Sequence, residues 1–240
     1  MTHPPFQARQ RGFTLIELLV AITIMAMMAV LSWRGLDGMT RAQNQTSQRA
    51  DEVLTLQAGL AQWKVDLDSL TQTPQVTSLD WDGRVLRLTR RTVPAGDGLA
   101  VVAWTRRSDA GGQWLRWQSP PIRNLAGWTD AWMQASRWAQ NASTIDRALE
   151  VAVVPLEDWQ IFYFRSDAWT NPLSSEGSLA IAAPAVPASG ASGAPVVPAV
   201  AAQAVVPEGI RLVLTLPARQ ATGGKITLDW VRPTLGGDKS

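Results

Sequence analysis

Residues 13–31 form an apolar run that only Thr14, Glu17 and Thr23 interrupt. A helix of this length covers roughly 30 Å at about 1.5 Å per residue, which is the thickness of a bilayer's hydrocarbon core. The run therefore predicts a helix that crosses a membrane once. An ionised carboxylate in hydrocarbon is strongly unfavourable unless another group pairs with it, so Glu17 needs a partner.

The residues before the run indicate how the helix is oriented. Arg9 and Arg11 precede it, and the first twelve residues contain no acid. Positive charge favours the cytoplasmic side, so we expect a cytoplasmic N-terminus, with everything after residue 31 across the membrane. In a secretory signal peptide the cleavage site follows the apolar core, whereas here the polar segment ends at Gly12, before the core. Cleavage after Gly12 would leave the helix on the mature chain.

The stretch "RGFTLIELLVAI" at this point resembles the class III leader of type IV prepilins and type II secretion pseudopilins. The resemblance implies that a membrane-embedded prepilin peptidase cuts between Gly12 and Phe13 and methylates the new amine of Phe13. It also implies a role in assembly for Glu17, which would become the fifth mature residue. Its carboxylate would pair with the N-terminal amine of a neighbouring subunit.

Composition narrows the possible chemistry. The chain has no cysteine, and its single histidine, His3, lies in the segment that cleavage would remove. A processed chain would therefore lack Ser-His-Asp and Cys-His sites as well as thiolate and imidazole metal ligands. We expect no metal, no cofactor and no catalytic residue. Without Arg9 and Arg11 the 22 basic side chains fall to 20, which equals the 20 acidic ones, so no nucleic-acid partner is implied.

The helix is expected to continue well beyond the membrane. No proline occurs between Pro5 and Pro74, and later apolar positions recur three and four residues apart. These positions are Val53, Leu56, Leu60, Trp63, Leu67 and Leu70. The pattern predicts one helix over about residues 14–71, softened at Gly35 and Gly38, whose amphipathic second half packs on a head domain. A free coiled coil is the alternative, although the stripe covers only about three heptads and lacks regular charges.

The period then changes to that of strands. Asp82-Gly83 and Gly111-Gly112 each separate two strand-like runs and predict turns between them. "TDAWMQASRWAQ" predicts a short helix with Thr129 or Asp130 as its N-cap. Further strands are predicted at about 150–154, 158–165, 209–216 and 225–231. The expected fold class is α+β, with the long N-terminal helix packed on an antiparallel β-sheet.

Composition also suggests the domain organisation. The Ala/Pro-rich stretch 176–207 predicts an insertion between two strands of one sheet. The expected parts are the leader 1–12, the transmembrane helix 13–33, the amphipathic helix 34–73, the β-rich head 74–175, the insertion 176–207, the C-terminal strands 208–233 and the tail 234–240. The pairs Arg90-Arg91 and Arg106-Arg107 stand beside strand-like runs and suggest solvated sheet edges.

Tryptophan is unusually frequent, with twelve residues against one tyrosine. Trp81, Trp104, Trp117 and Trp159 lie in strand-like runs, which predicts that they fill the core. A few indoles are expected at the rim, with at least one at an interface with another subunit.

Later segments resemble the minor pseudopilin J family of type II secretion systems. They are "WRGLDGMTRAQ", "LQAGLAQWKVDLDSL", "VVAWTRR", "WLRWQSPP", "YFRSDAWTNP" and "PEGIRLVLTL". The resemblance implies a non-catalytic subunit that joins the I and K minor pseudopilins at the tip of a periplasmic filament. Its other implied partners are the major pseudopilin, the prepilin peptidase and the inner-membrane assembly platform.

Two alternatives remain open. One is a minor pilin of a type IV pilus, which would share the leader, the helix and the sheet. The other is a membrane-anchored periplasmic enzyme, for which Asp66, Asp68, Asp80 and Asp82 would be the candidate acids. Asp66 and Asp68 are two residues apart on a helix and therefore do not share a face.

Overall fold

The structure is a computed structural model that describes residues 12–92, 98–174 and 206–233. Nearly all of the expected leader and insertion, and the whole expected tail 234–240, lie outside the described residues. The chain divides into two units, Met1–Ala50 and Asp51–Ser240.

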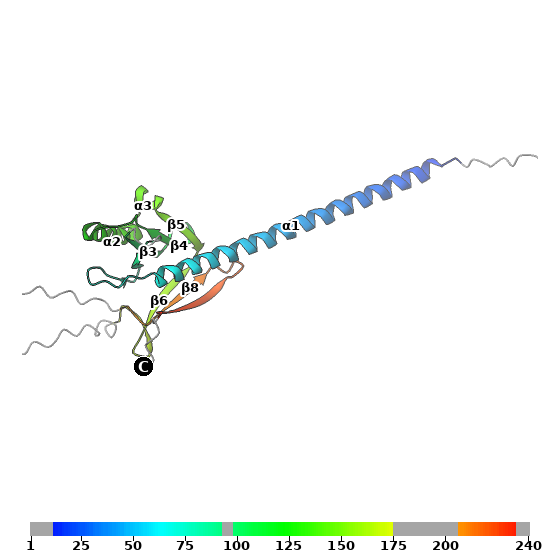
Figure 1. Cartoon of the computed structure of the whole chain (residues 1–240). Coiled ribbons are helices and arrows are strands. Elements are labelled where there is room, and N and C mark those ends of the chain that lie inside the picture. Colours follow the sequence, from blue (N-terminus) through cyan, green and yellow to red (C-terminus); the bar gives the residue numbers. More distant parts are fainter. Residues whose placement is uncertain (1–11, 93–97, 175–205, 234–240) are drawn as a thin grey trace, which may run out of the picture. The chain divides into compact units, whose positions relative to one another are not determined.

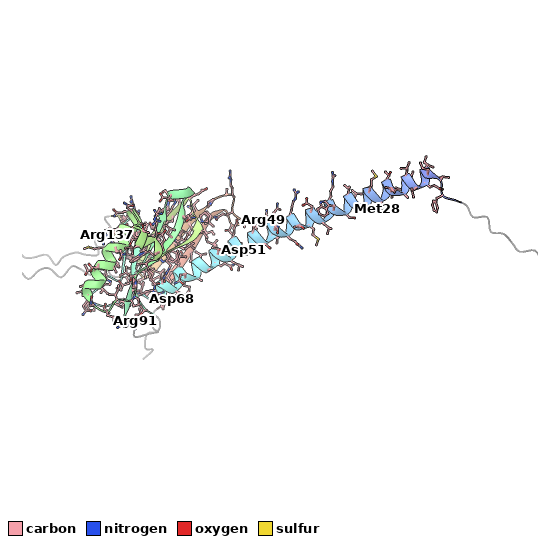
Figure 2. The ribbon with its side chains drawn as sticks, turned by 90° about the horizontal axis from the view of Figure 1, so that it is seen from above. Met28, Arg49, Asp51, Asp68, Arg91 and Arg137 are labelled. Carbon is pink, nitrogen blue, oxygen red and sulfur yellow. The ribbon has the colours of Figure 1, made fainter. Side chains whose placement is uncertain are left out.

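The first unit consists of the start of α1 (Leu15–Asp68), the predicted long helix. Every described residue up to position 52 is exposed, and side chains such as Met28 stand free of other elements (Figure 2). One 18-residue stretch of α1 has a mean hydropathy of 2.4. The helix is therefore long and apolar enough to cross a membrane. Within it, the Thr23 hydroxyl donates to the Leu19 carbonyl oxygen at 2.8 Å, so this polar group needs no other partner.

The second unit is the head, formed by the end of α1 and all the later elements (Figure 1). In chain order these are β1 (Leu79–Trp81), β2 (Val85–Arg91), β3 (Leu99–Arg107), the 3-10 turn η1 (Asp109–Gly111), β4 (Gln113–Gln118), α2 (Leu125–Gln140), α3 (Thr144–Ala148), β5 (Glu150–Pro155), β6 (Asp158–Arg165), β7 (Ala168–Thr170), β8 (Gly209–Leu216) and β9 (Gly224–Val231).

The strands form two antiparallel sheets where the sequence suggested one. The first has the order β1-β2-β3-β4-β5 and the second the order β7-β6-β8-β9. The chain changes sheets between two adjacent residues. The Leu156 N–H donates to the carbonyl oxygen of Gly112, directly before β4 of the first sheet, and the Glu157 N–H donates to that of Thr215 in β8 of the second. The α+β class, the strands and both predicted turns are confirmed. Gly83 and Gly112 adopt φ values of 90° and 88°, which favour glycine.

The head has four layers, in the order α2, first sheet, α1 and second sheet. Alternation along β3 explains why the first sheet is covered on both faces. Val102 and Trp104 join the core that contains α1 and the second sheet, whereas Val101 and Ala103 pack with α2. The predicted apolar stripe of α1 therefore lies between the two sheets.

The centre of the core is a cluster of tryptophans. Trp63 of α1 lies 5.4 Å from Trp104 and 5.8 Å from Trp114 of the first sheet, measured between ring centroids. The same ring lies 6.5 Å from Trp159 of the second sheet. The prediction that tryptophans fill the core is confirmed for Trp104, Trp117 and Trp159, which are all buried. One indole of α1 thus joins the cores of both sheets.

The N-cap predicted for the short helix between β4 and β5 is wrong. Helix α2 begins at Leu125 and is capped by Asn124, whose side chain accepts a hydrogen bond from the Gly127 N–H at 2.7 Å. The extra turn forms because Trp128 packs on the sheet and its indole N–H donates to the Thr89 hydroxyl at 2.9 Å.

The solvated-edge interpretation of the arginine pairs is also wrong. Strands β2 and β3 each have a neighbour on both sides. Arg90 forms a salt bridge with Asp66, and Arg107 forms one with Glu150. Of these four arginines Arg91 alone is exposed, and it is labelled in Figure 2. The second arginine pair and Arg90 therefore hold the head together and do not protect an edge.

Gly59 lies where α1 comes close to β5 of the first sheet. A Cβ atom there would lie 2.2 Å from Cγ1 of Val153, a distance that real Cβ atoms do not reach. By contrast, a Cβ at Gly38, in the exposed part of α1, would meet nothing within 4 Å.

We predict that Gly59→Ala destabilises the head by about 1–3 kcal/mol, because α1 or β5 must move apart to fit the methyl group. The matched variant Gly38→Ala should stabilise α1 by up to about 1 kcal/mol, through helix propensity alone. Urea unfolding of the full chain in detergent, followed by tryptophan fluorescence, measures both. Equal midpoints for Gly59→Ala and the wild type would contradict the packing of α1 described above.

Candidate functional site

The start of α1 is closed by a reciprocal pair of hydrogen bonds between Thr14 and Glu17. Oε2 of Glu17 accepts bonds from the backbone N–H and the hydroxyl of Thr14, both at 3.0 Å. In return, the Glu17 N–H donates to the Thr14 hydroxyl oxygen at 3.4 Å. With Thr14 just before the helix and Glu17 at its third position, this is a capping box. The acid in the apolar run therefore has a partner within its own helix.

The second carboxylate oxygen of Glu17 is still available. Within the described residues no group donates to Oε1, while a carboxylate has about four acceptor positions on its two oxygens. The helix N-terminus also carries partial positive charge, which favours an anion in the first turn. Glu17 can thus cap its own helix and accept a further donor from outside at the same time.

The bond between Gly12 and Phe13 is accessible. Both residues are exposed, and Phe13 retains 89% of its accessible surface. A Cβ at Gly12 would meet nothing within 4 Å, so the chain's own packing does not require glycine there. Any requirement for glycine at this position must come from a molecule that binds the segment.

Asp66, one of the candidate acids of the enzyme alternative, is fully buried in the head. Its Oδ1 accepts from Gln62 Nε2 at 2.9 Å, Arg90 Nη1 at 2.7 Å and Arg116 Nη2 at 2.9 Å. Its Oδ2 accepts from Trp104 Nε1 at 3.0 Å and Arg116 Nε at 2.7 Å. Five hydrogen bonds leave this carboxylate no room to act as an acid or a base on a substrate.

Asp68 faces another part of the head. It forms a salt bridge with Lys64 at 2.6 Å and accepts a hydrogen bond from Trp230 Nε1 of β9 at 2.8 Å. Partial burial raises the pKa of Asp68, but the hydrogen bonds from Lys64 and Trp230 outweigh it, so its pKa lies below the usual range. The group is therefore a carboxylate at neutral pH.

The remaining two candidate acids support the first hairpin. Asp80 pairs with Arg87 across the β1-β2 ladder. Asp82 accepts from the backbone N–H groups of Arg84 at 2.9 Å and Val85 at 2.8 Å, which fixes the turn. Each of the four acids thus has its own structural partners. Across the described ranges 12–92, 98–174 and 206–233, no group of three or more His, Cys, Asp or Glu side chains could hold a metal ion.

The structure brings the sequence-predicted residues Gly12, Phe13 and Glu17 together at the start of α1. The capping role of Glu17 was missed, although Thr-x-x-Glu before an apolar run is a recognisable signal for it. The partners of Asp66 in the first sheet were missed too, and they lie 24 to 50 residues further along the chain.

Together these features define a membrane-length helix that starts at an exposed Gly-Phe bond and leads into an α+β head. The profile of the family described as the prokaryotic N-terminal methylation motif matches residues 7–33, so the chain carries this motif.

One solved structure with some similarity is a chain of the GspK-GspI-GspJ complex from the type 2 secretion system of enterotoxigenic Escherichia coli. The sequences are 11% identical, the TM-score is 0.43, and the match covers 76% of this chain and 99% of that one.

We predict that Thr14→Ala loosens the first turn of α1, because it removes the hydroxyl on which the capping box depends. Amide hydrogen exchange of residues 15–18, in detergent micelles, should become faster. Glu17→Gln should leave exchange near the wild-type rate, since glutamine can occupy the same position of the box. Unchanged exchange in Thr14→Ala would show that the box does not hold the helix start.

Proposed function

We propose that the chain is a non-catalytic minor pseudopilin of a type II secretion system, acting in the tip complex of the periplasmic pseudopilus. The observation that carries the proposal is the methylation motif at an exposed Gly12-Phe13 bond, directly before a membrane-length helix. The segments that resemble the J family support the choice among pseudopilins. The chain would then help to initiate or cap the filament that drives export of folded proteins.

Processing is the first step of the proposed role. The prepilin peptidase would cut between Gly12 and Phe13 and methylate the amine of Phe13. Arg9 and Arg11 would hold the leader on the cytoplasmic side of the inner membrane, which places the head in the periplasm.

Assembly is the second step, and it depends on Glu17. Oε2 would continue to cap its own helix, while Oε1 would accept the Phe13 amine of a neighbouring subunit. Opposite charges attract strongly at low dielectric, although desolvation offsets much of that gain. The pair would therefore fix the register between subunits more than it would add to stability. The I and K minor pseudopilins, the major pseudopilin and the inner-membrane platform are the proposed partners.

A non-catalytic role agrees with the arrangement of the acids. Asp66 is saturated with hydrogen bonds, and Asp80 and Asp82 hold a hairpin. A processed chain would also lack both histidine and cysteine. The alternative function, a minor pilin of a type IV pilus, is compatible with the same motif and head and is separated from the first by its binding partners.

We predict that Gly12→Val blocks processing without changing the fold, since Gly12 contacts no other part of the described chain. Mass spectrometry of the chain purified from membranes should find Phe13, with a methylated amine, as the first residue of the wild type and Met1 as that of the variant. Gly12→Ala, the smallest change, tests how much of the effect is side-chain size. A wild-type chain that keeps Met1, or is cut after residue 31, would overturn the processing proposal.

A second prediction separates the two roles of Glu17. Glu17→Gln keeps the capping box but loses the charge, whereas Thr14→Ala loses the box but keeps the charge. If the carboxylate pairs with an amine of another subunit, Glu17→Gln and Glu17→Val should be cleaved normally but assemble poorly, and Thr14→Ala should assemble more nearly as the wild type does. Secretion at native expression and crosslinked oligomers in membranes are the measurements. Normal secretion by Glu17→Val would contradict the charge pair.

A further inference from the structure

The last turn of α1 carries two acids that reach opposite sheets. Asp66 binds side chains of β2, β3 and β4 in the first sheet, whereas Asp68 binds Trp230 of β9 in the second. Two residues apart on a helix correspond to a rotation of about 200°, so the two side chains must diverge. In Figure 2, Asp68 marks this end of α1 within the head. The helix is thus tied to each sheet by a separate carboxylate.

The hydrogen bonds and salt bridges of Asp66 are directional, unlike the apolar packing around them. Arg90 and Arg116 retain only 12% and 13% of their side-chain surface, and they meet a carboxylate that is completely buried. Removing one partner from such a group leaves an unpaired buried charge, which is strongly unfavourable. Burial of aromatic and aliphatic surface, by contrast, depends little on direction.

The hydrogen bonds of Asp66 exclude a shift of α1 along its axis. The apolar stripe repeats every three or four residues, so a shift by one turn, about 5.4 Å, would still place apolar side chains between the sheets. It would, however, put Gln62 or Leu70 in the place of Asp66. Both guanidinium groups would then lose their carboxylate. The apolar character of the stripe permits the shift, whereas the close contact of Gly59 with Val153 opposes it sterically and the charged cluster opposes it through the lost ion pairs.

We propose that Asp66 is a positioning residue that fixes the rotation and the axial register of α1 against the first sheet, independently of the tie to the second sheet through Asp68. The inference goes beyond the proposed function and does not depend on it. The buried charges select one arrangement of α1 against the first sheet, while apolar burial supplies the stability.

The experiment measures distances between α1 and each sheet in the full chain in detergent. Because the chain has no cysteine, pairs of introduced cysteines carry spin labels without background. Leu54 on α1, Val151 on β5 and Val231 on β9 are exposed by 61%, 58% and 72%. The pair Leu54→Cys/Val151→Cys reports on the first sheet and Leu54→Cys/Val231→Cys on the second. Pulsed electron resonance should give one narrow distance distribution for each pair in the otherwise wild-type chain.

The decisive variant replaces the cluster by apolar side chains, as Asp66→Leu/Arg90→Met/Arg116→Met. We expect it to fold, with a melting temperature only moderately below that of the wild type, because buried charges often exchange for apolar groups without loss of stability, although the buried Trp104 N–H loses its acceptor. Its distribution for the first sheet should broaden or split, while that for the second sheet should stay narrow. Asp68→Ala, the matched control, should leave the distribution for the first sheet narrow.

Three results would overturn the proposal. A single narrow distribution at the wild-type distance in the apolar variant would show that packing alone sets the register. Failure of this variant to fold would assign the cluster to stability. Equal broadening of the distance distributions for both sheets would show that the contacts of Asp66 and Asp68 do not act independently.

Discussion

One helix must satisfy two different surroundings, and the rest of the structure depends on how it does so. Up to residue 52 its side chains are exposed on every side, and the first part of this stretch is apolar all round, as lipid requires. From Val53 onward only one face of the helix is buried, and its apolar side chains lie between the two sheets. Without α1 the sheets would lose the shared core around Trp63, so the head needs the same helix whose first part is long and apolar enough to cross a membrane.

The two acids placed in apolar surroundings are stabilised in the same way, by hydrogen-bond donors close to the carboxylate. Glu17 and Asp66 both have donors within hydrogen-bonding distance, so neither carboxylate faces apolar surroundings alone. The donors of Glu17 come from its own first turn, which leaves one oxygen for another molecule. Those of Asp66 come from α1 itself and from three strands, which leaves none. The first arrangement is therefore open to an intermolecular contact, whereas the second is closed and purely structural.

Local patterns predicted most of the elements. The spacing of apolar residues predicted α1, and alternation with glycine turns predicted the strands around Gly83 and Gly112. The split into two sheets could not be predicted, because the switch at Leu156 depends on bonds to residues far away in the chain. The arginine pairs were misjudged for the same reason: whether Arg90 lies at an edge depends on which strands flank β2.

Some residues of the candidate site could be predicted from the sequence, whereas the cluster around Asp66 could not. Gly12, Phe13 and Glu17 follow from a local motif, and the structure adds the capping box that Thr14 forms with Glu17. The cluster around Asp66 joins residues from α1 and three strands, so no local pattern could indicate it.

A minor pseudopilin of a secretion filament, the function proposed for this chain, should bind the other minor pseudopilins. Affinity purification of the full chain, in detergent and from a strain that expresses both a type II secretion system and a type IV pilus, tests it most directly. We expect the I and K minor pseudopilins to be recovered in defined stoichiometry with the chain. Recovery of pilus minor pilins in their place would contradict it and support the pilus alternative.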